Sequence, residues 1–576
     1  MIVRKKWIPA IVTGVLVLWL ANGLRAADSP KRTGPPDQAE VMRSLELFTR
    51  VFEKINTYYV DEDIDPNELV RKAIEGMLQS LDPHSQFLDN RMYDDLMTST
   101  QGSFGGLGIE LSVRDNYPTV VSPMEGTPAY TQGIQGGDQI IEIEGEDTYK
   151  WPISKAVSKL RGPQGTEVHF KVKREGAEQP IDFAITRAII EIESVRYAMK
   201  IGDVGYIRVI NFAQDTAEEL EKRVAALESQ GIKGLVLDMR YNPGGLLRSA
   251  REVSQLFLDS GKKIVYTRGR TPRQNADYYS TTPENKVRAK SYPIALLING
   301  GSASASEIVA GALQDWDAAV IIGETSFGKG SVQTVYPLSE TEALKLTTAK
   351  YYTPSGRCIH KEHPKEDEQA AAEDEENPDR QQSDRPDAVK PDGSKPAVGK
   401  PEGSKPDAGK LDAKKSEAPQ PAETFRTVGG RKVTGGGGIV PDIVIRQPDP
   451  TQFAIDLERK NYFFQYAIKY VARHPQMHEF KQMLADDKFT YDPKAWDDNK
   501  DYVQLGIRRE VARRLHGSKA AYLVSIEGDE QLKRALDIFQ HGHTMKEFFA
   551  LTGDDLKAVP TEEIKKRMHT EAATTR

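Results

Sequence analysis

Cysteine is nearly absent from this 576-residue sequence, which contains only Cys358. A single thiol cannot form a disulfide within the chain, and it cannot build the multi-thiolate sites that hold zinc or iron–sulfur clusters. An excess of positive charge is also missing, because 78 basic and 85 acidic side chains leave a net charge of −7. The sequence therefore disfavours a nucleic-acid-binding protein that depends on phosphate contacts.

Several common catalytic patterns are missing as well. The sequence has no Gly-x-Ser-x-Gly elbow, its ten histidines include no HExxH pair, and the residues around Lys329 do not have the spacing of a phosphate-binding loop. His169 is the only histidine in the regions expected to form the β-rich module or the core, and we expect it to be packed or exposed. Because these patterns are missing, we expect no cofactor and no metal.

An apolar run lies at the N-terminus, and no second apolar run is long enough to span a membrane. Basic residues 4–6 precede the run Trp7–Ala21. A basic segment followed by an apolar run shorter than about 20 residues is typical of a signal peptide. We expect export, with cleavage after Gly23 or near Ala26 and Ala27; an uncleaved anchor is the alternative.

Changes in residue pattern divide the chain into segments. Apolar residues at helical spacing, such as Val41, Leu45 and Phe48, predict a packed pair of helices before residue 100, although the same stripe would suit a dimer. A β-rich module follows, and then an alternation of strands and helices that predicts a mainly parallel sheet. The segment after His360 is rich in Lys, Glu, Asp and Pro and poor in apolar residues, which predicts a disordered insert.

The predicted fold is therefore an α+β multidomain protein with N-terminal helices, a β-rich domain, an α/β core and a helical C-terminal extension. The predicted segments are a signal peptide (1–27), an N-terminal helical region (28–100), a β-rich domain (101–188), the core (189–360), the insert (361–424), the end of the core (425–448) and a C-terminal helical region (449–576).

A serine-rich turn in the core is the first candidate for chemistry. Gly300 to Glu307 connect a predicted strand, Ile294–Ile298, to a predicted helix. Ser304 at this position would present its hydroxyl beside the free N–H groups of a helix N-terminus, which suit an oxyanion. Ser304 and Glu307 also have the spacing of a capping box, and this motif alone favours a cap.

A lysine follows the next predicted strand, Ala319–Ile322. Lys329 lies between two glycines in Phe327-Gly328-Lys329-Gly330. Because neighbouring strands lie about 4.8 Å apart, the ends of the two strands can meet. A desolvated lysine has a lowered pKa and can accept the proton of a serine. The residues alone leave a Ser–Lys dyad and a solvent-exposed loop lysine equally open.

These motifs together resemble the carboxyl-terminal processing proteases, also called tail-specific proteases. The resemblance is carried by Leu81-Asp82-Pro83-His84-Ser85, Asn242-Pro243-Gly244-Gly245, Gly301 to Ile308, Phe327 to Gln333, Tyr352 to Arg357 and Gly438 to Asp442. It implies a serine endopeptidase with Ser304 as nucleophile and Lys329 as base. It also implies that Gln333 orients the lysine, and that the backbone N–H groups of Ala305 and Gly245 hold the oxyanion.

The resemblance further implies that the β-rich domain is a PDZ domain. The loop Gly106-Leu107-Gly108-Ile109 then captures the free C-terminal tail of a protein substrate, which adds as a strand. Arg161 would take part in regulatory switching, or otherwise only cap the surface of the module. The family suggests the bacterial periplasm. A non-catalytic scaffold, and an enzyme inactive until an adaptor or a homo-oligomer opens it, remain alternatives.

Overall fold

A computed structural model describes residues 38–61, 63–124, 126–174, 176–282, 292–361, 423–470 and 477–552. The predicted signal peptide and most of the predicted insert lie outside the described residues. The chain divides into two compact units, Met1–Met77 and Leu78–Arg576. In the first unit, α2 (Gln38–Tyr58) and α3 (Pro66–Gln79, which ends just beyond the boundary) form as predicted. No residue of α2 is buried, so its apolar stripe is exposed rather than packed as expected.

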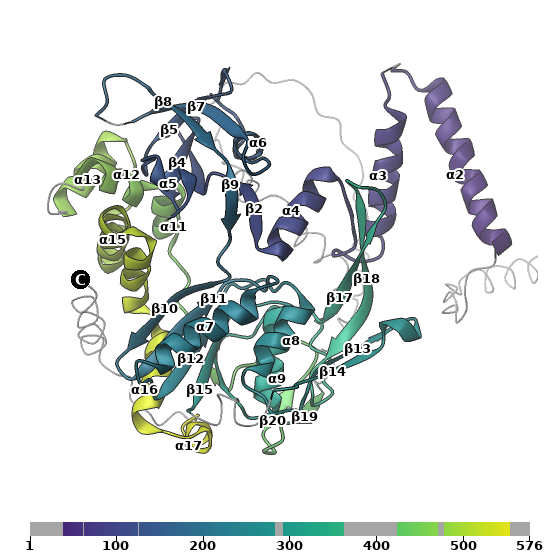
Figure 1. Ribbon diagram of the computed structural model, residues 1–576, viewed down its shortest axis with the longest axis vertical. Helices are drawn as coiled ribbons and strands as arrows, with labels where there is room; N and C mark the ends of the chain where they lie inside the picture. The colour runs from purple at the N-terminus through teal and green to yellow at the C-terminus, as the bar shows by residue number, and fades with distance from the viewer. Residues whose placement is uncertain are drawn as a thin grey trace, which may run out of the picture. The chain divides into compact units, whose positions relative to one another are not determined.

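A six-stranded sheet forms the centre of the second unit, in the order β10-β11-β12-β15-β16-β21. Figure 1 labels its strands β10, β11, β12 and β15. All its neighbouring strands are parallel except β10 and β11, so the predicted mainly parallel sheet is confirmed. Its strands are β10 (Val195–Ile201), β11 (Val204–Val209), β12 (Gly234–Asp238), β15 (Ile294–Ile298), β16 (Val320–Gly323) and β21 (Ile443–Val444).

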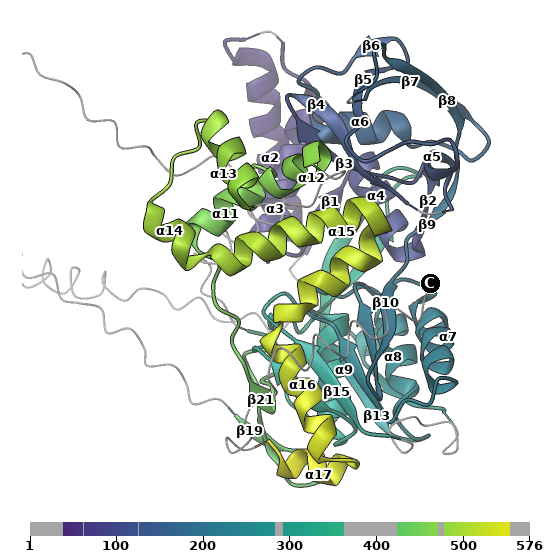
Figure 2. The same cartoon turned by 90° about the vertical axis from the view of Figure 1, so that its left-hand side faces the viewer.

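Alternate residues of the central strands face two different helical layers. Leu235 and Leu237 of β12 pack with α7 (Thr216–Glu228), α8 (Leu247–Gln255) and α9 (Ala305–Asp315). Val236 of the same strand packs on the other face, against α16 (Glu530–His541) and α17 (Met545–Ala550). The period of two along a strand thus builds a helix–sheet–helix sandwich, with the C-terminal helices as the second layer (Figure 2).

A second sheet lies beside this core and holds the strands after the lysine loop. It has the order β1-β18-β13-β14, with β17 also paired to β18. The sequence pattern did not predict β1, which joins the segment before the β-rich domain to the core hairpin. The strands are β1 (Gln86–Leu88), β13 (Lys263–Gly269), β14 (Ala276–Tyr279), β17 (Ser331–Pro337) and β18 (Ala343–Tyr352), with a short helix η1 (Pro272–Gln274).

The β-rich domain is a small sheet of order β3-β4-β5-β7-β8, with β6 paired to β5 and a separate β2–β9 ribbon. The helix α6 lies along β3. The helix α4 (Asn90–Gln101) precedes the domain, whose elements are β2 (Ser103–Gly106), β3 (Ile109–Arg114), β4 (Tyr117–Pro123), α5 (Pro128–Thr131), β5 (Gln139–Ile143), β6 (Glu146–Asp147), α6 (Ile153–Leu160), β7 (Glu167–Lys173), β8 (Ile181–Thr186) and β9 (Ala188–Glu191).

The C-terminal region is helical, as predicted. Its longest helix, α15, bends at Gly517 and leads toward α16 (Figure 2). A two-stranded ribbon precedes this region, and no helix in the described part of the chain has both the length and the apolar character to cross a membrane. The elements are β19 (Thr424–Arg426), β20 (Lys432–Thr434), α11 (Gln452–Arg459), α12 (Tyr462–Tyr470), α13 (Met477–Asp486), α14 (Pro493–Asp498), α15 (Lys500–Ser525) and η5 (Ile526–Gly528).

Candidate active site

The serine turn and the lysine loop lie at the carboxyl ends of two neighbouring parallel strands. Ile298, the last residue of β15, pairs with Gly323, the last residue of β16. The N–H of Phe327 donates to the carbonyl oxygen of Ser302 at 3.0 Å, which joins the two loops directly. Carboxyl ends of parallel strands are the usual place for a site in such sheets.

Ser304 occupies an unusual backbone conformation at the start of α9. Its φ is 53° and its ψ is −111°, a region that residues with a side chain rarely adopt. Such a conformation costs on the order of 1–3 kcal/mol and persists only where the surroundings enforce it. Ser304 is the N-cap residue and its N–H donates to the Glu307 carboxylate at 2.8 Å, so the capping interpretation is confirmed. This cap does not exclude a chemical role for the hydroxyl.

The Glu307 carboxylate holds both loops at once. It is fully buried and accepts four hydrogen bonds: from the N–H of Ser304, from the hydroxyl of Ser326, and from the N–H groups of Gly328 and Lys329. Burial raises the pKa of Glu307 above its ordinary value, while these hydrogen bonds act in the opposite direction. The sequence predicts the cap but not the bonds to the lysine loop, because no local pattern reveals them.

A tyrosine of β18 reinforces the same junction. The Tyr351 hydroxyl lies 3.0 Å from the carbonyl oxygen of Ser304 and 2.5 Å from that of Lys329. The side chain is fully buried, and burial raises the pKa of its hydroxyl well above the ordinary value, so the hydroxyl stays a donor. Ser304 and Lys329 themselves are half-buried. Fixed backbones with partly accessible side chains are what a reactive pair requires.

The Asn-Pro-Gly-Gly loop after β12 lies against the serine turn. The side-chain oxygen of Asn242 accepts from Gly244 N–H, and its carbonyl oxygen accepts from Ala303 N–H. A Cβ atom on Gly244 would lie 2.8 Å from the Cβ of Ser304, so only glycine fits. Among the described residues, neither Gly245 nor Ala305 has a hydrogen-bond acceptor for its N–H. Both amides are thus available to an incoming group.

Gln333 lies on β17, four residues beyond Lys329. Its side-chain nitrogen donates to the hydroxyl oxygens of Ser331, at 3.0 Å, and of Thr347, at 3.3 Å. The Thr347 hydroxyl donates in turn to Asp82, from the turn that precedes β1. The segment before the β-rich domain therefore reaches the hairpin next to Lys329.

The turn that contains Asp82 also contains His84, which was not among the site residues predicted from the sequence. Burial lowers the pKa of His84 from 6.5 to about 4, and the charge of Lys329 acts in the same direction. The position of His84 in the Asp82-Pro83-His84-Ser85 motif was the available signal, since that motif is part of the family pattern.

In the β-rich domain, the predicted tail-binding loop runs from the end of β2 to the start of β3. Leu107 is buried, and Gly108 has a φ of 76° with Thr127 directly beside it. Among the described strands, β3 pairs only with β4, so its other edge is open beside α6. An open edge next to a helix can accept an extended peptide.

Arg161 ends α6 and contacts the helix in front of the domain. It donates to Asp95 of α4 at 3.0 Å and lies over the ring of Phe104, 4.6 Å from its centre. Asp95 is in the middle of α4 and Phe104 is the second residue of β2. Arg161 thus contacts both α4 and β2.

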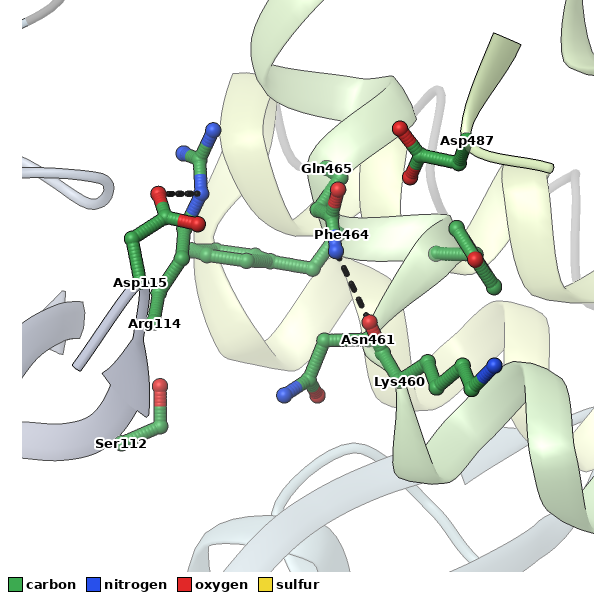
Figure 3. A pocket seen from close by; sticks show the side chains of 9 residues that line it. Ser112, Arg114, Asp115, Lys460, Asn461, Phe464, Gln465 and Asp487 are labelled. Atoms are coloured by element: carbon green, nitrogen blue, oxygen red, sulfur yellow. Dashed lines mark hydrogen bonds and ion pairs between the residues drawn. The ribbon is translucent and has the colours of Figure 1, made fainter. Parts of the chain in front are cut away.

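A cavity of about 290 Å³ lies between the β-rich domain and the C-terminal helices (Figure 3). Ser112, Arg114 and Asp115 line one side of it, and Asn461 and Asp487 lie on the other. It contains none of the predicted site residues. Its walls show that α12 lies next to the β3–β4 turn.

Comparison with known families assigns three parts of the chain. A model described as peptidase family S41 matches residues 203–370, and a PDZ domain model matches residues 96–173. A third, described as the activating protease CtpB N-terminal domain, matches residues 15–92. The described β-rich domain and core lie within or beside the first two matches.

Individual proteins are similar over more than half of the chain. A carboxy-terminal-processing protease of Bartonella bacilliformis is 45% identical over 331 residues, covering 56% of this chain and 74% of the relative. The carboxy-terminal processing protease CtpA of Bacillus subtilis is 36% identical over 358 residues, covering 62% and 73%. The solved photosystem II D1 C-terminal processing protease is 28% identical, covers 55% of this chain and 90% of its own, and has a TM-score of 0.31.

Proposed function

The chain belongs to the carboxy-terminal processing proteases of peptidase family S41 and is a serine-type peptidase with a PDZ domain, and from this premise we propose that it cleaves exported proteins near their C-termini with a Ser304–Lys329 dyad. The observation that carries the proposal is the Glu307 carboxylate, which accepts hydrogen bonds from the backbone N–H groups of both residues.

In the proposed reaction, Lys329 acts as the base. Its neutral amine takes the proton of the Ser304 hydroxyl as the oxygen attacks the substrate carbonyl carbon. Lys329 is half-buried, so its side chain is only partly exposed to water. Gln333, four residues further along β17, would orient the lysine side chain.

The oxyanion formed by this attack needs preorganised donors. The N–H groups of Ala305 and Gly245 are proposed for this role, because Ala305 follows Ser304, Gly245 follows the Gly244 that contacts Ser304, and neither N–H has an acceptor among the described residues. The first N–H groups of α9 also place positive potential there. When the tetrahedral intermediate collapses, Lys329 protonates the leaving amine, and water then hydrolyses the acyl-enzyme.

Selection of the substrate is proposed to occur at the PDZ domain. The open edge of β3 would pair with the tail, while Gly106, Leu107, Gly108 and Ile109 surround its carboxylate. Arg161, linked to Asp95 and Phe104, would report the occupied state to the rest of the chain. The proposed compartment is the periplasm, and an adaptor or a second copy of the chain would be its regulatory partner.

The test compares the full exported chain with Ser304→Ala and Lys329→Ala variants. Each is incubated with an unfolded protein ending in apolar residues and with the same protein carrying a charged tail, and mass spectrometry locates the cuts. We expect both variants to lose at least about 10³-fold in rate, and the wild type to prefer the apolar tail. Ser339→Ala and Lys432→Ala, at exposed positions, serve as matched controls.

Each outcome separates one alternative. Cleavage that survives in both variants overturns the dyad. A wild type that binds the tail without cutting it supports a scaffold, and activity that appears only after a partner is added supports a gated enzyme. Equal cleavage of both tails overturns tail selection and leaves the dyad standing.

A further inference from the structure

A buried arginine lies at the root of the Asn-Pro-Gly-Gly loop. Arg240 is the second residue after the end of β12, and its side chain is 4% exposed. All three guanidinium nitrogens donate hydrogen bonds. Its Nε and Nη2 donate to Asp238, at 2.9 and 2.6 Å. Its Nη1 and Nη2 donate to Asp529, at 2.9 and 2.5 Å, and Nη1 also donates to Gln531, at 2.9 Å.

These contacts use the full donor capacity of the side chain. A guanidinium group has five N–H donors, and Arg240 makes five hydrogen bonds to side-chain oxygens. Asp238 and Gln531 are fully buried and Asp529 is 8% exposed. Removing one partner from a buried, charged group leaves a donor without an acceptor, which is costly because water cannot replace it.

Two of the three partners come from the far end of the chain. Asp529 is the N-cap of α16, where it also accepts from the N–H of Leu532, and Gln531 donates to the carbonyl oxygen of Ile445. The peptidase family match ends at residue 370 and the two other matches end earlier, so they assign nothing to α16.

The loop that Arg240 begins is the loop that lies against Ser304. Met239 accepts from the Ser302 hydroxyl, and Asn242 accepts from Ala303 N–H and from the Ser306 hydroxyl. Three residues after Asn242 comes Gly245, with a φ of 142° and an N–H without an acceptor among the described residues. A continuous set of contacts therefore connects Arg240 and the following loop, which includes Gly245, to the serine turn.

We propose that Asp529 and Gln531 are positioning residues for the reaction: through Arg240 they fix the 240–245 loop so that the Gly245 N–H points at the developing oxyanion. This inference rests on the proposed function, since it assumes the Gly245 amide to be an oxyanion donor. The C-terminal helical region is then part of the catalytic apparatus rather than an appendage to it.

The test uses the full chain with Asp529→Asn. Asparagine caps a helix as well as aspartate does, so α16 keeps its N-cap while Arg240 loses a carboxylate. Glu530→Gln is the matched control, because this neighbouring carboxylate is 54% exposed and pairs with Lys533 instead. Gln531→Met, which keeps the volume, is the second variant. A fluorophosphonate that labels Ser304 counts the folded sites, so that kcat refers to intact protein.

We expect Asp529→Asn to lower kcat roughly 10- to 100-fold with KM nearly unchanged, because misplacing an oxyanion donor acts on the transition state alone. The inhibition constant of a peptide boronic acid, which mimics the tetrahedral intermediate, should weaken by a similar factor. The affinity of an uncleaved tail peptide should stay the same. Gln531→Met should act in the same direction with a smaller effect.

Three results overturn the inference. If Asp529→Asn has the kcat of the wild type, the inference is overturned while the proposed function stands. The inference is also overturned if Asp529→Asn leaves the inhibition constant of the boronic acid unchanged and lowers only the fraction of protein labelled at Ser304. That result would reveal only a folding defect. A wild type that neither cleaves nor reacts at Ser304 overturns the proposed function, and the inference falls with it.

Discussion

Among single residues, Glu307 joins the two loops of the site most directly. Its four accepted hydrogen bonds include two from the backbone of the lysine loop and one from Ser304. In a Glu307→Gln variant, the new NH2 group would face N–H donors that it cannot satisfy. We expect a loss of about 2–3 kcal/mol in the free energy of unfolding and a drop of roughly 10²-fold in kcat/KM, measured by denaturant unfolding and steady-state kinetics.

Glu340→Gln, at an exposed position, is the control for Glu307→Gln and should leave both quantities unchanged. A Glu307→Gln variant with wild-type activity and stability would show that the two loops hold their positions without this carboxylate.

His84 gives a prediction about pH. Its pKa in the folded state, about 4, lies below the value of 6.5 that the unfolded chain has. Protonation therefore favours the unfolded state, so the stability that neutral His84 provides is complete above pH 6.5 and is lost as the pH falls toward 4. The melting temperature of the wild type should fall more steeply across this window than that of His84→Gln.

His169→Gln, an exposed histidine on β7, should follow the wild-type curve and serves as the control. Parallel curves for the wild type and His84→Gln would contradict the prediction.

The residues chosen from sequence share one property: they belong to motifs that are contiguous in the chain. Ser304 and Lys329 could be singled out because each lies in a glycine-containing turn after a predicted strand, β15 or β16. Gly245 was named only because the Asn-Pro-Gly-Gly motif resembles the family pattern. Tyr351 and Asp529 could not, because each reaches the site only through the fold. The positive φ of Ser304 was equally hidden, since its cause is the surrounding packing.

At the level of elements, the close contact between Gly244 and the serine turn can be tested. Gly244 has a φ of 104°, and a Cβ there would lie 2.8 Å from the carbonyl oxygen of Ala303. We expect Gly244→Ala to abolish most of the activity and to lower the free energy of unfolding by about 1–3 kcal/mol.

Gly300→Ala is the control for this loop, because a Cβ at Gly300 meets nothing within 4 Å. It should keep the stability of the wild type. If Gly244→Ala unfolds at the same denaturant concentration as Gly300→Ala, the two loops are less closely packed than their distances indicate.

Predicted elements agree with the structure where pattern alone decides them. The strand Ile294–Ile298 has the predicted limits, and the strand predicted over Ala319–Ile322 forms over Val320–Gly323. The short strand β1 was missed because three residues carry too little periodicity, and its existence depends on the partner β18. The exposed stripe of α2 shows the converse: periodicity predicts a helix without showing what covers it.

For the whole molecule, the second helical layer is required by the core itself. Residues of α16 and α17 cover Val236, Leu297 and Ile322 on one face of the central sheet. A chain that ends at residue 448 would expose this face to water. We expect it to aggregate or to unfold without a cooperative transition, as measured by light scattering and calorimetry. A soluble, cooperatively folding truncated chain would contradict this view of the C-terminal region.

The bend in α15 has a consequence for the coupling between ligand binding at the PDZ domain and ligand binding at the active site. Before the bend at Gly517, Arg514 contacts the carbonyl oxygen of Gly136 in the PDZ domain; after it, Tyr522 stacks on Tyr197 of the core, seven residues ahead of Asp529. One helix thus touches both the domain that would hold the tail and the segment that supports Arg240. Thermodynamic linkage is reciprocal. If a bound tail raises the affinity of the active site for a boronic acid, the boronic acid must raise the affinity of the PDZ domain for the tail by the same factor.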